Sequence, residues 1–587
     1  MLSSLGKRFL SSNTVNITLN GLKVAVPASS TILDSCKANN CFVPTLCYHP
    51  RLPESGSCRL CLVDVEGCGS PLPACRTKVW EGMNICTETE RVADAVRLNL
   101  EMIAQNHCFS CASCAVDGEC ELQDLLRIYG IPQPANTITP LLFGGSSAIA
   151  CDSTKCVACG RCVQACAALQ GLGVWEYGGR AHASLPQTSG HAPLDATACI
   201  NCGQCATFCP TGALTERDQV AEVMAVIRAK KAAGKTVVIQ TAPAVRVTIS
   251  EAFGMEPGTV TTGQLVAALK KAGFDHVFDV DFAADLTIME EGTELLSRLG
   301  KGGPMMTSCC PGWVNFVEKH YPDFIPNLSS CKSPQGMMGA VVKTYWAEKM
   351  GIAPEDIFLV SAMPCTAKKD EAARPQLEGD VDVVLTTREL ARLLKLHRPG
   401  VNFSTLAPES FSDPHGLGDS TGAAVLFGAS GGVMEAALRT VHAVVTGEEL
   451  PDALLDLEGA VRPNGESLHT ATVPVGDANV RVAVVHGLQA TREFLERLKA
   501  GEEYDFVEVM ACPGGCVGGG GNPSSQDGDI LARRTAGIYG DDVNMAVRRS
   551  HKNEGVKALY DEFLGSPNGH KSHELLHTTY TDRSVKL

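Results

Sequence analysis

The most informative part of the chain lies near the C-terminus and reads Glu508-Val-Met-Ala-Cys-Pro-Gly-Gly-Cys-Val-Gly-Gly-Gly-Gly-Asn-Pro523. Cys512 and Cys516 stand inside a run of glycines, which lets the backbone come very close to whatever the thiolates hold. Such a cradle suits a large inorganic cluster better than a single zinc ion, which more often takes C-x2-C pairs. A glycine-rich surface loop with two unrelated thiols is the alternative.

Two further cysteine motifs lie upstream of this stretch. One is Thr307-Ser-Cys-Cys-Pro-Gly-Trp313, which places adjacent cysteines before a Pro-Gly turn. The other is Met363-Pro-Cys-Thr-Ala-Lys-Lys-Asp-Glu371, which follows the apolar run 357–360. This run reads as a buried strand, so Cys365 is predicted at a strand end, where α/β folds place their chemistry.

Together the three motifs resemble the signatures TSCCPGW, MPCxxKxxE and ExMACxGGCxxGGGxP of the iron-only ([FeFe]) hydrogenases, in the same order. The resemblance implies an H-cluster, in which a 4Fe–4S cube is joined to a diiron subsite carrying CO, cyanide and a bridging dithiolate. The implied cube ligands are Cys310, Cys365, Cys512 and Cys516, with Cys516 as the bridge. The residues implied around the diiron subsite are Ala242, Pro243, Gln335, Met363, Lys368 and Met510.

Length, charge and cysteine usage bound the remaining possibilities. A chain of 587 residues predicts several domains. A net charge of −15 argues against a nucleic-acid partner, because backbone phosphates require a basic surface. No apolar run is long enough to predict a membrane span. The 27 cysteines cluster in C-x2-C patterns, which indicates metal binding in a reducing compartment.

Residues 1–12, MLSSLGKRFLSS, are basic and serine-rich, and the first acidic residue of the chain is Asp34. This composition resembles an organellar transit peptide, and an ordinary disordered N-terminus is the alternative. We therefore expect a hydrogenosome or another mitochondrion-like organelle, with the cytoplasm as the alternative location.

Residues 13–90 are predicted to form a 2Fe–2S domain. Alternating runs around Asn20-Gly21 predict a β-hairpin, and a helix is expected at 31–38. The spacing C-x10-C-x2-C-x13-C then resembles a plant-type, β-grasp ferredoxin in the variant found in hydrogenases and complex I. A four-cysteine zinc site is the alternative. The implied ligands are Cys47, Cys58, Cys61 and Cys75.

Residues 91–135 are predicted to form a small helical domain. An amphipathic helix is expected over 91–105. The following H-x3-C-x2-C-x5-C spacing resembles the His-ligated 4Fe–4S motif of hydrogenases and the large complex I subunit. The implied ligands are His107, Cys111, Cys114 and Cys120, and Cys108 is left free.

Residues 136–218 contain an internal duplication of the bacterial ferredoxin run C-x2-C-x2-C-x3-C. Because the fourth cysteine of each run serves the other cluster, two 4Fe–4S cubes are expected. The first has the ligands Cys156, Cys159, Cys162 and Cys209, and the second has Cys199, Cys202, Cys205 and Cys166.

From residue 219 onward, short apolar strands alternate with helices, and strands are expected over 237–240, 277–281, 381–385 and 480–485. This alternation predicts open, mostly parallel sheets covered by helices. The whole chain is thus expected to be a multidomain α+β and α/β protein, with a two-lobed α/β catalytic domain over 219–587. The catalytic cluster is expected between its lobes, and the tail around Ser572–His577 is expected to wrap the surface.

A buried metal site also needs a route for protons. Cys309 directly precedes the implied ligand Cys310, so its thiol is free to face the diiron subsite and exchange a proton. Glu291 and Glu294 share one face of a predicted helix, and the Ser329 hydroxyl can both donate and accept. The resemblance places a relay on Cys309, Glu291, Ser329 and Glu294 in that order, whereas two helical glutamates alone would read as a solvated face.

Three function classes fit these observations to different degrees. The first is an enzyme, a ferredoxin hydrogenase that reversibly reduces protons to H2 with the help of dedicated maturation proteins. The second is an electron-transfer subunit like that of complex I, which lacks the three C-terminal motifs. The third is a hydrogenase-like assembly factor or sensor, which lacks the long N-terminal array. Ferredoxin is the expected donor, because no G-x-G-x-x-G follows a strand.

Overall fold

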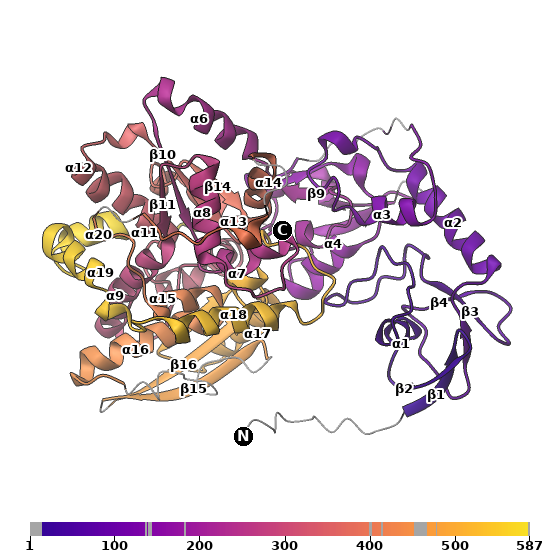
Figure 1. Cartoon of the computed structure of the whole chain (residues 1–587). Coiled ribbons are helices and arrows are strands. Elements are labelled where there is room, and N and C mark those ends of the chain that lie inside the picture. Colours follow the sequence, from indigo (N-terminus) through magenta and orange to yellow (C-terminus); the bar gives the residue numbers. More distant parts are fainter. Residues whose placement is uncertain are drawn as a thin grey trace.

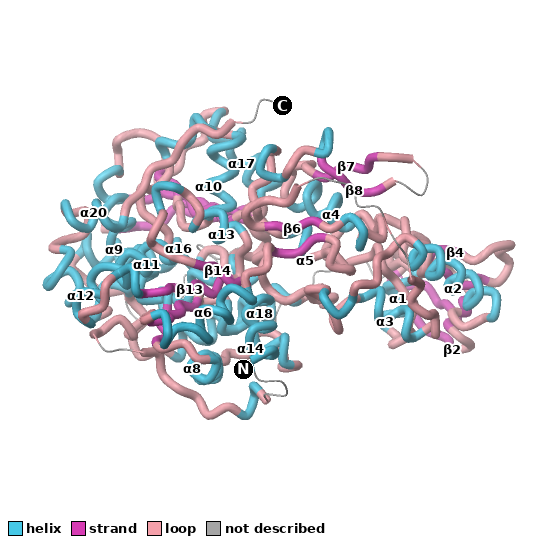
Figure 2. Tube along the Cα trace, turned by 90° about the horizontal axis from the view of Figure 1, so that it is seen from above, coloured by secondary structure: helices cyan, strands magenta, loops and turns pink. Residues whose placement is uncertain are grey.

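A computed structural model describes residues 14–135, 138, 144–180, 184–397, 402–412, 415–450, 466–476 and 478–584. The predicted transit peptide over 1–12 lies outside these residues. Within them, no helix is long and apolar enough to cross a membrane. Figure 1 shows the accessory domains extending from one side of the larger C-terminal domain, and Figure 2 shows the same arrangement from above.

The N-terminal domain is built on the predicted hairpin. Strands β1 (Thr14–Leu19) and β2 (Leu22–Pro27) pair antiparallel. The turn between them uses the left-handed residues Asn20 and Gly21, with φ of 49° and 85°. The sheet order is β2-β1-β5-β3-β4, completed by β3 (Leu62–Val65), β4 (Leu72–Pro73) and β5 (Asn84–Cys86). Helix α1 (Ile32–Ala38) covers it and begins with a capping box from Thr31 and Asp34.

The next two domains are small and mostly irregular. The helix predicted at 91–105 is α2 (Glu90–Gln105), and it is followed by α3 (Glu121–Ile128). The duplicated ferredoxin runs form matching short helices, α4 (Arg161–Gln164) and α5 (Gln204–Thr207). Each begins after a left-handed glycine, Gly160 or Gly203, so the sequence duplication is also a structural one. Strands β6 (Ile149–Cys151) and β9 (Leu214–Glu216) pair antiparallel at the ends of this domain.

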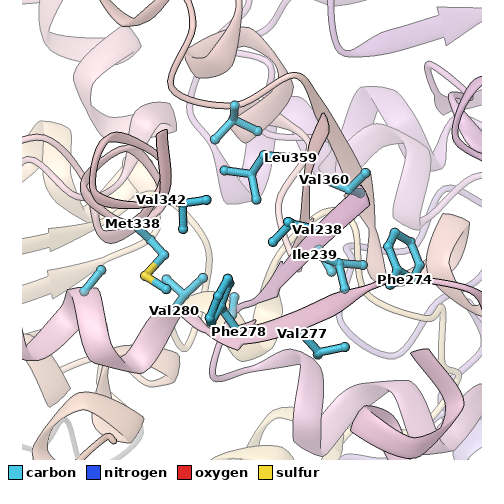
Figure 3. Packing of buried hydrophobic residues seen from close by; sticks show 14 of the residues in the cluster. Val238, Ile239, Phe274, Val277, Phe278, Val280, Met338, Val342, Leu359 and Val360 are labelled. Atoms are coloured by element: carbon cyan, nitrogen blue, oxygen red, sulfur yellow. The ribbon is translucent and has the colours of Figure 1, made fainter. Parts of the chain in front are cut away.

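The catalytic domain contains two four-stranded sheets, as the alternation predicts. The first has the order β11-β10-β13-β14 and is parallel throughout. Its strands are β10 (Thr236–Thr241), β11 (His276–Asp279), β13 (Ile357–Met363) and β14 (Val383–Thr386). Figure 3 shows side chains such as Ile239, Phe278 and Val360 packed in the core around this sheet.

The second sheet has the order β12-β17-β16-β15. Strands β12 (Met305–Met306), β17 (Phe506–Met510) and β16 (Ala478–His486) are parallel, and β15 (Leu468–Val475) is an antiparallel edge strand. Helix α9 (Val280–Arg298) contributes to the cores of both sheets, with Leu286 in one and Ile288 in the other.

The C-terminal tail forms α18 (Ile530–Asn544), α19 (Glu554–Leu559) and α20 (His570–Leu576). Helix α19 contacts α9, and α20 contacts α11 (Pro334–Val341). The tail therefore covers the catalytic domain as predicted, but its last turn points inward. His577, directly after α20, is only 7% exposed.

Candidate functional site

A cavity lies where the two sheets of the catalytic domain face each other. The space not filled by protein atoms, including the open mouth, is about 690 Å³. All four cysteines predicted to hold the cube line it, together with Cys309 and all six residues predicted around the diiron subsite: Ala242, Pro243, Gln335, Met363, Lys368 and Met510. Phe427 and Val280, which the motifs do not include, complete part of the wall.

The strands position these residues because each motif follows the carboxyl end of a parallel strand. Ala242 follows β10, Cys365 follows β13, and Cys512 follows β17. Cys310 comes after β12 and is the N-cap residue of α10 (Pro311–His320). Since parallel strands end at the same edge of a sheet, residues far apart in sequence meet at one crevice.

The glycine cradle is required by close backbone contacts. Gly515 has φ of 89°, and a Cβ there would lie 2.5 Å from the Ser430 nitrogen. Buried Glu508 anchors the same region by accepting hydrogen bonds from the backbone N–H groups of Gly431, at 2.6 Å, and Met434, at 2.7 Å. These hydrogen bonds join β17, which leads to Cys512 and Cys516, to the segment 431–434.

The chemistry of the cavity fits an iron–sulfur group. Burial raises the pKa of the Cys310, Cys365, Cys512 and Cys516 thiols, so these thiols must lose protons when they bind metal. The Ala511 N–H donates to Cys310 Sγ at 3.5 Å, a contact that can tune a cluster ligand. Gln335 Oε1 is buried and has no hydrogen-bond partner among the described residues, so an acceptor is left over at the cavity wall.

Lys368 has more partners than its motif indicated. Its ammonium donates to Glu371 Oε2 at 2.8 Å and to the Cys309 carbonyl oxygen at 3.2 Å. Burial lowers the pKa of Lys368, but the Glu371 carboxylate outweighs this and the pKa is raised. Lys368 is thus held as a cation at the cavity wall before any cofactor ligand is considered.

Residues of the predicted proton relay lie beside the cavity, and both carboxylate oxygens of Glu291 are buried with no hydrogen-bond partner among the described residues. Glu291 is 1% exposed, and burial together with the charge of Glu294 raises its pKa to about 8. Burial, and after it the charge of Glu291, raises the pKa of the Cys309 thiol well above its usual range. Ser329 Oγ donates to Glu294 Oε2 at 2.7 Å.

The 4Fe–4S ligands predicted in the N-terminal half also gather into separate groups. One pocket is lined by Cys156, Cys159, Cys162 and Cys209, as the crossed ligation pattern predicts. A second pocket is lined by His107, Cys111, Cys114 and Cys120, with Cys108 also in its wall. His107 Nδ1 lies 3.0 Å from the Lys155 carbonyl oxygen, and burial lowers the pKa of the ring, which favours the neutral imidazole that ligation needs.

The two remaining sets of cysteines are also close together. Cys61 and Cys75 have their sulfurs 3.3 Å apart, and a hydrogen bond from the Cys58 thiol lowers the pKa of Cys47 to about 5. In the last set, Cys199 and Cys205 pack in one core cluster with Cys166, and Cys202 is close enough to Cys205 for that thiol to raise its pKa.

The second ferredoxin-like run, 199–209, contacts the glycine-rich loop after β17 directly. Gln204 Nε2 donates to the Gly518 carbonyl oxygen at 2.9 Å, and Thr207 Oγ1 donates to that of Gly520 at 2.9 Å. After burial, the largest cause of the raised Cys202 pKa is Cys512, which lines the catalytic cavity. A cluster held by Cys202 would therefore adjoin one held by Cys512.

Sequence reasoning missed several residues that support this site. Glu371 stands at the end of the second cysteine motif, but its pairing with Lys368 could be inferred only from their three-residue spacing on a helix. Ser330, Glu290 and His577 form a hydrogen-bonded group beside Glu294, and nothing in the sequence brings residue 577 near residue 290.

The fold and these groups define an iron–sulfur oxidoreductase with a buried, cysteine-lined catalytic cavity. The chain matches the family models "Iron only hydrogenase large subunit, C-terminal domain" over residues 235–520 and "Iron hydrogenase small subunit" over 528–583. It also matches a 2Fe-2S iron-sulfur cluster binding domain over 12–90, the NADH-ubiquinone oxidoreductase-G iron-sulfur binding region over 97–134, and a 4Fe-4S binding domain over 192–215.

Similar proteins extend over nearly the whole chain. NADP-reducing hydrogenase subunit HndD of Solidesulfovibrio fructosivorans is 44% identical and aligns over 97% of this chain and 99% of its own length. Iron hydrogenase 1 of Clostridium pasteurianum is 36% identical, with 96% and 99% covered. A solved [FeFe]-hydrogenase of Chlamydomonas reinhardtii superposes with a TM-score of 0.55 at 42% identity, covering 63% of this chain and all of its own.

The chain therefore belongs to the iron-only hydrogenase family. It has the iron hydrogenase activity of that family, served by N-terminal iron–sulfur relay domains. The 2Fe–2S match decides against the zinc alternative for the first domain, and the full-length hydrogenase matches decide against a relay subunit without a catalytic site.

Proposed function

We propose that this hydrogenase holds its H-cluster through Cys310, Cys365, Cys512 and Cys516, with Cys516 as the bridging ligand. The observation that supports this assignment is the single cavity lined by all four cysteines and by Cys309. When bound, the cluster supplies the metal at which protons and electrons combine to H2. Lys368 and Gln335 would orient its polar ligands, and Met363, Met510 and Phe427 would exclude water.

Protons would reach the cavity through the relay that starts at Glu294. Ser329 accepts a proton on its hydroxyl while it donates to a carboxylate, as its 2.7 Å contact with Glu294 allows. Glu291, with a pKa of about 8, is protonated at neutral pH and able to deliver a proton toward Cys309. The Cys309 thiol, at the cavity wall, makes the last transfer.

The test of this assignment is Cys309→Ala. The variant should keep all iron and the infrared bands of metal-bound CO and cyanide, yet lose H2 turnover by at least about a hundredfold in both directions, because the last proton carrier is gone. Cys36→Ala is the control, since Cys36 is also buried but lies in α1 of the N-terminal domain, away from the cavity. A fully metallated Cys309→Ala protein with a near-normal rate would exclude this route.

We further propose one 2Fe–2S cluster and three accessory 4Fe–4S clusters, held by the sixteen N-terminal ligands predicted above. Support comes from the two ligand-lined pockets and the two close groups of thiols. The corresponding domain limits are 13–90, 91–135, 136–218 and 219–587. Iron analysis together with electron paramagnetic resonance of the reduced protein counts the clusters.

For the electron donor, a ferredoxin-type carrier fits the chain best, since no G-x-G-x-x-G follows a strand. The name of the similar HndD subunit supports a second candidate, electron exchange with NADP(H) through another subunit. Reduced ferredoxin should support H2 evolution by the isolated chain. Failure with ferredoxin, together with NADPH-driven evolution once a partner subunit is added, would favour the second candidate.

For the location, the basic start over 1–12 supports import into a hydrogenosome or a mitochondrion-like organelle. A fluorescent protein carrying these twelve residues should enter the organelle in the native host. Diffuse cytoplasmic fluorescence would contradict this proposal.

A further inference from the structure

The C-terminal tail brings a histidine to the outer end of the relay. After α20 the chain pairs with the segment that carries Ser329, through an isolated β-bridge between Cys331 and His577. The Thr578 N–H donates to the Ser330 carbonyl oxygen at 2.8 Å, which fixes the backbone on the other side. The backbone at His577 is therefore fixed beside Ser330 by main-chain contacts.

The ring bridges two carboxylates on α9. His577 Nδ1 lies 2.8 Å from Ser330 Oγ, and this hydroxyl donates to Glu294 Oε1 at 3.1 Å. On the opposite edge, His577 Nε2 lies 3.2 Å from Glu290 Oε2. A continuous path of hydrogen-bonded atoms thus runs from Glu290 through His577 and Ser330 to Glu294.

This path supports two arrangements of protons. When the imidazole is protonated, both ring N–H groups donate, one to Glu290 and one to Ser330, and the Ser330 hydroxyl donates to Glu294. When it is neutral with its proton on Nε2, Nδ1 accepts from Ser330 instead. Gain and loss of one proton therefore reverses the Ser330 hydroxyl, which is the behaviour of a proton wire.

The charged groups around His577 favour this exchange. Glu290 is fixed by Tyr560 Oη at 2.5 Å and by the Asn568 N–H at 2.6 Å, so its carboxylate faces the ring. His573, which is exposed, stacks on His577 with ring centroids 4.4 Å apart. One face of the buried His577 ring is thus covered by a side chain that itself lies at the surface.

Arg298 also contacts Glu294 but cannot transfer a proton to it. Arg298 Nη2 lies 2.5 Å from Glu294 Oε1. A guanidinium remains protonated at all accessible pH values, so it can hold the carboxylate but cannot pass a proton through itself. Of the two side chains that reach Glu294 Oε1 here, Ser330 is the one able to carry a proton inward.

We propose that His577 is the outer proton station of the relay and exchanges protons between solvent and Glu294 through Ser330. In the inward step, the His577 Nδ1–H proton moves to Ser330 Oγ while the Ser330 hydroxyl proton moves to Glu294. Once Glu294 has passed its proton inward and the Ser330 hydroxyl has turned back toward Glu294, Nδ1 is free to take a proton from water, so one proton enters for each one delivered and no electrons move. This inference rests on the relay proposed above.

The experiment measures H2 evolution by the full, matured chain in H2O and D2O with a small artificial reductant. His577→Gln should lower the rate at least about tenfold and increase the solvent isotope effect, because proton entry becomes limiting. Its infrared bands and iron content should match the unmodified protein. His551→Gln, which removes another histidine of the tail that contacts Glu449 at 3.0 Å, is the matched control and should leave the rate unchanged.

Substitutions of Ser330 separate proton transfer from support of the tail. Ser330→Ala keeps the β-bridge and His577 but removes the hydroxyl, so it should reproduce the loss, and Ser330→Thr should restore the rate. A normal rate and isotope effect in either His577→Gln or Ser330→Ala would overturn the proposal. Cys309→Ala distinguishes the two levels, because an active Cys309→Ala enzyme refutes the relay itself, whereas an inactive one beside an active His577→Gln enzyme refutes only this outer station.

Discussion

In the proposed relay, Glu291 is expected to set the pH range in which protons can be delivered. Burial and the charge of Glu294 raise its pKa to about 8, so the carboxyl group is protonated below that pH and ionised above it. H2 evolution needs the protonated form, so the rate with an artificial reductant should fall as the pH rises through about 8. Glu291→Gln should be inactive at every pH while it keeps its infrared bands. An active Glu291→Gln enzyme with an unchanged pH profile would contradict this role.

Lys368 is the residue expected to capture the diiron unit. Its ammonium is buried at the cavity wall and paired with Glu371. Lys368→Met removes the cation, so the matured variant should retain the cube but lose the CO and cyanide bands and the activity. Lys332→Met is the matched control, because Lys332 pairs with Asp380 at 2.8 Å and does not line this cavity. Normal infrared bands in Lys368→Met would show that the cation is not needed.

Among individual residues, those that belong to contiguous motifs are predicted well from the sequence. Cys309, Lys368 and Met510 are read from their motifs, and all three line the cavity. The pairing of His577 with Glu290 spans 287 positions and has no local signal. It arises from the way the tail folds back, which is a tertiary property.

Among the helices and strands, the strands are predictable because their apolar runs are short and end at turn residues. The run predicted as a strand over 277–281 shows the limit of this reading. Strand β11 ends at Asp279, whose side chain accepts from the Asp281 N–H at 3.1 Å and caps α9. The cap ends the strand two residues early, because an N-cap carboxylate competes successfully with continued pairing.

The loop after β17 should tolerate no side chain at Gly515. Its φ is 89°, and a Cβ added there would approach the Ser430 nitrogen to 2.5 Å, so Gly515→Ala must strain the backbone or part the two segments. We expect the free energy of unfolding to fall by at least about 1 kcal/mol and the protein to take up little cluster. Gly540→Ala, in α18 with nothing near its Cβ, should be neutral or stabilising. Iron content after reconstitution compares the two, and full uptake by Gly515→Ala would show that the loop can accept a side chain.

Across the whole molecule, Arg161 ties three accessory domains together. It is 1% exposed, donates to both oxygens of Glu121 and to the Tyr48 carbonyl oxygen at 2.7 Å, and precedes the implied ligand Cys162. Arg161→Leu should leave turnover with an artificial reductant unchanged and reduce ferredoxin-driven turnover several-fold, because the domains and their clusters would separate. Arg127→Leu, at an exposed ion pair, is the control. Equal loss with both reductants would argue against a relay role.

A truncated catalytic domain should remain active. The ion pairs of Glu216 indicate that it should begin before the predicted domain limit at residue 219. A start at Asp218 removes Glu216, which pairs with Arg388 at 2.6 Å and Arg392 at 3.0 Å, and leaving such guanidiniums unpaired costs about 3 kcal/mol. A chain beginning at Thr211 keeps Glu216 and should be the more stable of the two. Both should evolve H2 with an artificial reductant if matured. A correctly metallated but inactive product would contradict the modular organisation.

All of these roles depend on an H-cluster held in the cavity between the two sheets by Cys310, Cys365, Cys512 and Cys516. Infrared spectroscopy of the full chain, purified after expression with the maturation proteins, is the most direct test. We expect bands from metal-bound CO and cyanide in the full chain and their loss in Cys516→Ala. A matured full chain without these bands, or a Cys516→Ala protein that keeps them, would show that the cavity does not hold the cluster in this way.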